Sequence, residues 1–147
     1  MNMDAMVDQK KRPNSKAEKK GVSGFNLKVL VVEDFETMRK AVVKVLSGLG
    51  MKVIEACNGI DALKVLDTES VDIVFSDLVM PEMDGFELCE EIRRRPNILH
   101  IPVIVISTHR DAHYVVRALR CGADDYLAKP FTASAAKRIV ERVTSNV

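Results

Sequence analysis

The chain has 147 residues, of which 47% are hydrophobic, and this length suits one compact domain but not two. Its 22 basic and 21 acidic residues leave a net charge of +1, so the overall charge gives no reason to expect nucleic acid or an anionic membrane as a partner. The longest apolar runs, such as residues 29–32 and 103–106, are far shorter than the roughly 18 residues that indicate a membrane-spanning helix. The first residues also lack the apolar core of a secretory signal, so we expect a cytoplasmic protein.

Residues 1–24 differ in composition from the rest of the chain. They carry six basic and three acidic side chains, together with Pro13, Gly21 and Gly24, and show almost no apolar periodicity. This composition is typical of a disordered segment, because too few apolar groups are present to form a core. We therefore expect a basic, disordered arm over residues 1–24 and one folded domain over residues 25–147.

From Phe25 onward, short β-branched runs alternate with helical patterns. The runs predict strands over residues 28–32, 52–56, 71–76, 103–107 and 126–128. Between the first two strands, apolar side chains recur at helical spacing up to the stop at Gly48 and Gly50: Met38, Ala41, Val42, Val45, Leu46 and Leu49. Further helices are expected over about 59–67, 85–95 and 112–121, with Gly122 as the residue that ends the last of these. A final helix repeats the apolar stripe at Ala136, Ile139, Val140 and Val143.

The alternation predicts an α/β domain of the (βα)5 type. Strands this apolar suit a parallel sheet that is buried on both faces, and right-handed crossovers then place helices on both sides of it in three layers. In such open sheets, ligands bind beyond the carboxyl ends of the strands. The residues at those ends are therefore the candidates for a functional site.

Polar residues follow the carboxyl end of four predicted strands. Glu33 and Asp34 follow the first, Asp77 follows the third, Ser107 closes the fourth and Lys129 follows the fifth. The intervals of 43, 30 and 22 residues from Asp34 through Asp77 and Ser107 to Lys129 are whole strand–helix units. We expect these side chains to meet at one edge of the sheet.

Taken singly, these residues have structural interpretations as well. Asp34 suits the cap of the first helix, Ser107 a satisfied hydroxyl at a strand end, and Lys129 a solvated loop charge. Three carboxylates in one cleft, however, repel one another unless a cation joins them, and Mg²⁺ is a hard ion that accepts such ligands and bridges to phosphate oxygens. A carboxylate placed there can act as a nucleophile toward a phosphoryl group, with a lysine to hold it.

Five sequence features in order resemble one family, the response-regulator receiver domains of two-component signalling. The features are Val31-Val32-Glu33-Asp34, the loop from Asp77-Leu78-Val79-Met80-Pro81 to Met83-Asp84-Gly85, the strand 102–107, Gly122-Ala123 with Tyr126, and Lys129-Pro130-Phe131. The resemblance covers about residues 26–146, and the segment from Glu33 to Arg39 resembles the single-domain, CheY-like chemotaxis branch. It implies a flavodoxin-like sheet with the strand order 2-1-3-4-5.

The resemblance implies a role for each candidate at the metal site. Asp77 would accept a phosphoryl group from a histidine kinase or a phosphotransfer protein. Asp34 and Asp77 would bind Mg²⁺ directly, together with the backbone carbonyl of Val79, and Glu33 would act through a water molecule. We therefore expect a phosphoaccepting signalling domain, not an enzyme that turns over a separate substrate.

The resemblance also implies a switch. Lys129 would contact the phosphoryl group, Ser107 would hydrogen-bond one of its oxygens, and Tyr126 would change rotamer as the following loop moves. The output would be a downstream protein that binds the face formed by the fourth helix, fifth strand and fifth helix, with a phosphatase as a further candidate partner. We expect no membrane and no nucleic acid partner.

Alternatives stay open at this point. The chain can be the receiver part of a longer protein with an enzymatic or DNA-binding output, and the sequence names neither the cognate kinase, the target nor an oligomer. A phosphohydrolase of the haloacid-dehalogenase type also uses a strand-end aspartate and Mg²⁺, but its second acid would stand where this chain has Val79. Val79, Thr108 and His109 depart from the commonest receiver pattern, so the lifetime of the phosphoryl group is not implied.

Overall fold

The structure, a computed structural model, describes residues 25–145, and the arm expected over residues 1–24 lies outside the described residues. In the described part, five strands alternate with five helices, as the sequence predicts. The strands are β1 (Lys28–Val32), β2 (Lys52–Ala56), β3 (Ile73–Asp77), β4 (Val103–Ser107) and β5 (Asp125–Ala128). The helices are α1 (Glu36–Gly48), α2 (Gly59–Thr68), α3 (Gly85–Arg94), α4 (Ala112–Arg120) and α5 (Ala133–Thr144).

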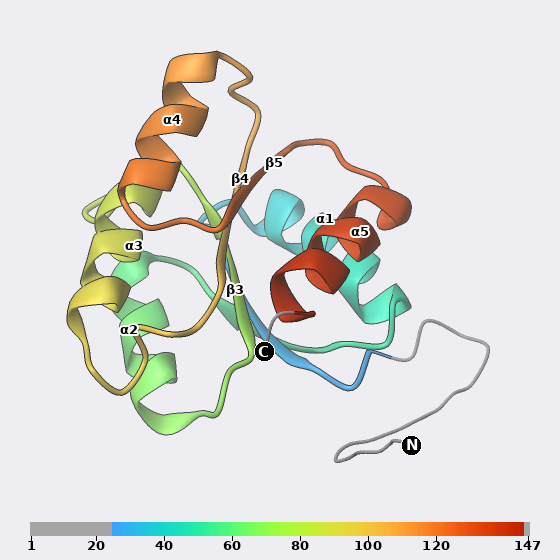
Figure 1. The fold of residues 1–147 in the computed structure, drawn as a ribbon. Coiled ribbons are helices and arrows are strands. Elements are labelled where there is room, and N and C mark those ends of the chain that lie inside the picture. Colours follow the sequence, from blue (N-terminus) through green and yellow to red (C-terminus); the bar gives the residue numbers. More distant parts are fainter. Residues whose placement is uncertain (1–24, 146–147) are drawn as a thin grey trace.

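The strands form one parallel sheet in the order β2-β1-β3-β4-β5, which confirms the order implied by the family resemblance. Helices α1 and α5 cover one face of the sheet, and α2, α3 and α4 cover the other (Figure 1). The chain reverses its direction of winding at β1, so the carboxyl ends of β1 and β3 lie side by side at the point where α/β sheets bind ligands.

Alternate residues of the strands build two separate cores. On β1, Val29 and Val31 pack in the cluster beneath α1 and α5, whereas Leu30 and Val32 pack in the cluster beneath α2, α3 and α4. All four side chains are fully buried. This explains why the strand reads as a continuous apolar run, because each face of a parallel sheet is covered by helices.

The third strand begins and ends later than the sequence suggests. Residues 71–76 were expected to form it, but the pairing with β1 starts at Ile73 and the pairing with β4 extends to Asp77. Val71 is buried in the core without belonging to the strand, and this burial explains the wrong start. The expected stop of the fourth helix is confirmed, because Gly122 has a φ of 105° and follows the C-cap Cys121.

Helix α1 buries part of the expected stripe, because Val42, Leu46 and, just after the helix, Leu49 lie in the core. Its buried residues are Arg39, Val42 and Leu46. The expected stripe members Met38, Ala41 and Val45 are instead more open to solvent, and with Phe131 and others they line an apolar cavity of about 250 Å³.

In residues 25–145, no helix is long and apolar enough to cross a membrane.

Candidate functional site

The carboxyl ends of the strands bring all the predicted site residues except Tyr126 into one pocket. Glu33, Asp34, Asp77, Ser107 and Lys129 line a cavity of about 290 Å³, as the intervals along the sequence predict. The backbone of β1, β3 and β4 ends at this edge, and Lys129 follows β5 directly. The parallel pairing of these strands therefore assembles a polar site from residues far apart in the chain.

Three carboxylates form the acidic part of the site. One oxygen from each of Glu33, Asp34 and Asp77 lies within 4.8 Å of the others, which is a spacing that can hold a metal ion. Asp34 does not cap α1, because the N-cap residue is Phe35 and no hydrogen bond from residues 25–145 engages the Asp34 carboxylate. The structural interpretation of Asp34 as a helix cap is therefore wrong, and its carboxylate is exposed at the pocket.

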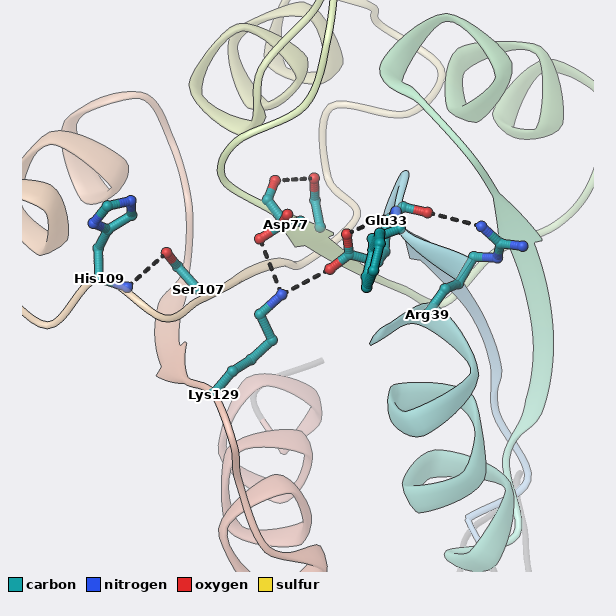
Figure 2. A network of polar contacts seen from close by, with 8 residues as sticks. Glu33, Arg39, Asp77, Ser107, His109 and Lys129 are labelled. Atoms are coloured by element: carbon teal, nitrogen blue, oxygen red, sulfur yellow. Dashed lines mark hydrogen bonds and ion pairs between the residues drawn. The ribbon is translucent and has the colours of Figure 1, made fainter. Parts of the chain in front are cut away.

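Lys129 supplies the positive charge of the site. Its Nζ atom lies 2.7 Å from Oε1 of Glu33 and 3.2 Å from Oδ1 of Asp77 (Figure 2). The side chain is buried, so the interpretation of Lys129 as a solvated loop charge is wrong. The peptide bond between Lys129 and Pro130 is cis.

Glu33 is a buried carboxylate whose pKa is set by burial and by its hydrogen-bond partners. Burial raises the pKa of Glu33, and the charge of Asp77 raises it further. Two hydrogen bonds lower this pKa again, one from Lys129 and one from the backbone N–H of Phe35, whose nitrogen lies 3.1 Å from Oε2. The ionised form of Glu33 is therefore supported by Lys129 and by the backbone at the start of α1.

Ser107 and Tyr126 are connected through the backbone of His109. The hydroxyl oxygen of Ser107 accepts a hydrogen bond of 3.0 Å from the N–H of His109 (Figure 2), and the hydroxyl of Tyr126 donates one of 2.7 Å to the carbonyl of the same residue. The ring of His109 also stacks on Tyr114, at 4.4 Å between ring centroids. The loop between β4 and α4 is thus tied to Ser107 in the site and to Tyr126 outside it.

The loop after Asp77 is shaped by the start of α3. Asp84 and Glu87 form a reciprocal capping box, so this part of the loop fixes where α3 begins. Gly85 packs directly on the backbone after β3, because a Cβ atom there would lie 2.4 Å from the carbonyl oxygen of Asp77. Val79 is 61% exposed and lines the pocket beside Asp77.

Sequence reasoning missed Arg39, which contacts the backbone of this site. Arg39 is buried in the first turns of α1, and its Nη1 atom donates a hydrogen bond of 3.0 Å to the carbonyl oxygen of Glu33 (Figure 2). Its Nε atom donates another, of 2.8 Å, to the carboxylate of Glu55. The sequence does contain an indication of this burial, because Arg39 precedes Val42 by three residues and so lies on the same, buried face of the helix.

Comparison with known proteins identifies relatives of the whole folded part. Residues 29–143 match the model of a family described as the response regulator receiver domain. The chemotaxis protein CheY-3 of Vibrio cholerae is 35% identical over 119 residues, which cover 80% of this chain and 92% of that protein. A probable transcriptional regulator, ycf27 of Cyanidium caldarium, is 40% identical over 104 residues. That match covers 71% of this chain but 41% of the regulator.

A solved structure agrees with the fold. The receiver domain of a sensor histidine kinase from Pseudomonas aeruginosa, described with a magnesium ion coordinated in its active-site cleft, superimposes with a TM-score of 0.74. It is 29% identical, and the match covers 80% of this chain and 97% of that one. The two chains therefore share the arrangement of strands and helices that surrounds the pocket.

Proposed function

The chain belongs to the response regulator receiver family, and we propose that Asp77 accepts a phosphoryl group from a phosphohistidine of a histidine kinase or phosphotransfer protein. One observation carries the proposal: the carboxylates of Glu33, Asp34 and Asp77 lie together at the carboxyl edge of the sheet, with the Lys129 ammonium 3.2 Å from Asp77. As a two-component receiver, the chain is a signalling phosphoacceptor and not a phosphohydrolase. We also propose that residues 25–147 form the receiver domain and residues 1–24 a basic arm.

The proposed step is an in-line displacement at phosphorus. An oxygen of Asp77 forms a bond to phosphorus while the bond from phosphorus to the donor nitrogen breaks, and the imidazole keeps that electron pair. The product is an acyl phosphate on Asp77. Lys129 is already within hydrogen-bond distance of the attacking carboxylate, so its ammonium group is placed to hold a phosphoryl oxygen during transfer.

The donor set of the pocket fits Mg²⁺. Carboxylate oxygens are hard ligands, and Mg²⁺ accepts one or two of them while keeping water molecules. Asp34 and Asp77 would bind the ion directly with the carbonyl of Val79, and Glu33, which Lys129 already engages, would act through a water molecule. When bound, the ion offsets the negative charge of the transferred group. The magnesium described in the Pseudomonas aeruginosa receiver supports this assignment.

The connection through His109 supports a switch. A phosphoryl group on Asp77 gives Ser107 a charged acceptor, and the hydroxyl of Ser107 currently accepts from the N–H of His109. Reorientation of Ser107 changes the loop that Tyr126 also holds. We propose that the face formed by α4, β5 and α5 reads this change by binding a downstream protein, and that a phosphatase ends the signal.

The pathway is proposed from the relatives. The CheY-3 relative is a chemotaxis protein matched over 92% of its length, and this supports a chemotaxis role for a receiver that acts by binding alone. The alternative is a receiver within a longer protein with an enzymatic or DNA-binding output. The ycf27 relative, of which the chain covers 41%, supports that arrangement.

The decisive experiment is phosphorylation in vitro. Incubation with Mg²⁺ and acetyl phosphate should add one phosphoryl group to the wild-type chain, as measured by intact mass. Asp77→Asn should stay unmodified, because its amide is not a nucleophile of this kind. Labelling that persists in Asp77→Asn, or a wild-type mass that does not change with donor and Mg²⁺, would refute the assignment.

A further inference from the structure

Within the part of the chain that the structure describes, only the backbone holds Asp34 at the site. In residues 25–145, no hydrogen bond or ion pair engages its carboxylate, and the residue is exposed. The other charged side chains of the site are different, because Lys129 donates hydrogen bonds to both Glu33 and Asp77. The position of the Asp34 carboxylate therefore depends on the peptide that joins it to Glu33.

That peptide is held from outside the site by Arg39. Its Nη1 atom donates a buried hydrogen bond of 3.0 Å to the carbonyl oxygen of Glu33. The carbonyl of Glu33 and the N and Cα atoms of Asp34 lie in one planar unit, so a bond that orients this oxygen also orients the backbone of Asp34. Figure 2 shows the guanidinium approaching this carbonyl from the side of Glu33 opposite Lys129.

The guanidinium is fixed in turn by the neighbouring strand. Its Nε atom lies 2.8 Å from Oε1 of Glu55 on β2, and Lys40 bonds to the other oxygen of the same carboxylate at 2.9 Å. Arg39 lies in the first turns of α1, where the helix dipole disfavours a cation. The relative exposure of Arg39 is nevertheless only 9%. Its two hydrogen bonds, to Glu55 and to the carbonyl of Glu33, explain why a cation is buried at this position.

We infer that Arg39 is a positioning residue for the Mg²⁺ site: by bridging Glu55 to the carbonyl of Glu33, it sets where the carboxylate of Asp34 is presented. Only the planar, forked guanidinium can make both bonds from one buried position, because the single ammonium of lysine is a point donor at the end of a flexible chain. This inference rests on the proposed function, since it concerns the same metal site.

Loss of the Arg39 charge and loss of its positioning role should change the Mg²⁺ affinity in opposite directions, and this makes the inference testable. Removal of a positive charge near a cation site strengthens Mg²⁺ binding by Coulomb's law. Loss of a group that orients a ligand weakens it, by roughly 10–100-fold for partners just outside the ligands of metal sites. Lys40 is a matched control, because it contacts the same Glu55 carboxylate and carries the same charge, and within residues 25–145 its side chain bonds only to Glu55.

The experiment measures the Mg²⁺ dissociation constant by calorimetric titration of the full chain, at a temperature well below each variant's melting transition. Arg39→Met should weaken Mg²⁺ binding about tenfold. Arg39→Lys, which keeps the charge and most of the packing, should also weaken it and serves as the test if Arg39→Met does not fold. Lys40→Met should leave binding unchanged or slightly stronger.

The outcomes separate this inference from the proposed function. Binding that is unchanged or stronger in both Arg39 variants would overturn the positioning role, with the phosphoacceptor assignment intact. Equal weakening in Lys40→Met would also overturn it, because the effect would then come from Glu55 and not from the bond to Glu33. A wild-type chain that binds no Mg²⁺ and gains no phosphoryl group would remove the proposed function, and the inference with it.

Discussion

The ammonium nitrogen of Lys129 lies 2.7 Å from Oε1 of Glu33, and both side chains are almost completely buried. The sequence predicts that Lys129 faces a phosphoryl group, whereas in the structure it neutralises the least exposed of the three carboxylates. A buried charge that loses its partner destabilises the fold, because the remaining charge keeps its desolvation cost. This pair therefore connects the chemistry of the site with the stability of the domain.

Lys129→Met should lower the free energy of unfolding by about 3 kcal/mol in the absence of Mg²⁺, which is the lower end of the range for breaking a buried pair. The lower end applies because the raised pKa of Glu33 lets protonation relieve part of the penalty. The same variant should bind Mg²⁺ more tightly, since a competing cation has gone, yet accept phosphate from acetyl phosphate more slowly. Urea denaturation with and without Mg²⁺ measures the first effect, and an unchanged unfolding midpoint would contradict it.

Gly85→Ala should destabilise the domain and slow phosphorylation. The added Cβ would lie 2.4 Å from the carbonyl oxygen of Asp77 and 2.9 Å from Cα of Leu78, so the backbone that carries the phosphoacceptor must shift. Overpacking of this kind costs about 1–3 kcal/mol. Thermal melting and the rate of labelling by acetyl phosphate measure the two effects.

Gly48→Ala is the matched control for that substitution. Nothing lies within 4 Å of the Cβ position at Gly48, which is exposed and ends α1. This variant should be about 0.5–1 kcal/mol more stable, because alanine loses less backbone entropy than glycine on folding. Equal melting temperatures for Gly85→Ala and Gly48→Ala would show that the start of α3 adapts without moving Asp77.

The cysteines should differ sharply in reactivity. Burial raises the pKa of the Cys89 thiol to about 11, and the side chain is buried in the core, whereas Cys57 is exposed. At pH 8 almost no Cys89 thiolate is present, so a thiol reagent should modify Cys57 first and Cys89 only after unfolding. Raising the pH toward 11 increases the thiolate fraction of Cys89, but access still requires opening of the fold. Mass-resolved labelling of wild type and Cys57→Ser tests this, and rapid loss of the Cys89 thiol in the folded chain would contradict it.

The phosphoryl group should be lost slowly without a phosphatase. Val79 is exposed at the pocket and offers no hydrogen bond to orient an attacking water molecule, and Thr108 adds bulk at the same pocket. Val79→Asn should speed the decay and Thr108→Ala should change it, with Mg²⁺ binding retained in both. Decay is followed by intact mass after removal of acetyl phosphate. A wild-type rate as fast as that of Val79→Asn would show that this side chain does not control the attack of water.

The local pattern of the sequence was sufficient to locate most of the site. Apolar runs bounded by helices predict parallel strands, and parallel strands place their carboxyl ends at one edge, so Asp34, Asp77 and Lys129 were brought together by rules of chain geometry alone. The boundary of β3 was wrong at both ends. Burial of Val71 and membership in the strand leave the same apolar signal in the sequence, and only the pairing partners distinguish them.

Only the tertiary structure decided the contacts in which one partner is a backbone group or a side chain on a distant strand. Arg39 bonds to the carbonyl of Glu33, which every residue possesses, and to Glu55, which lies 16 positions away on β2. Tyr126 bonds to the carbonyl of His109. Every residue has a backbone carbonyl, so a hydrogen bond to a carbonyl does not require a particular amino acid at the acceptor position and cannot be predicted from the sequence. Burial of an apolar face, in contrast, requires apolar residues at the regular spacing of a helix or strand. The sequence by itself therefore determined which carboxylates share an edge, and the packed structure determined how each one is held.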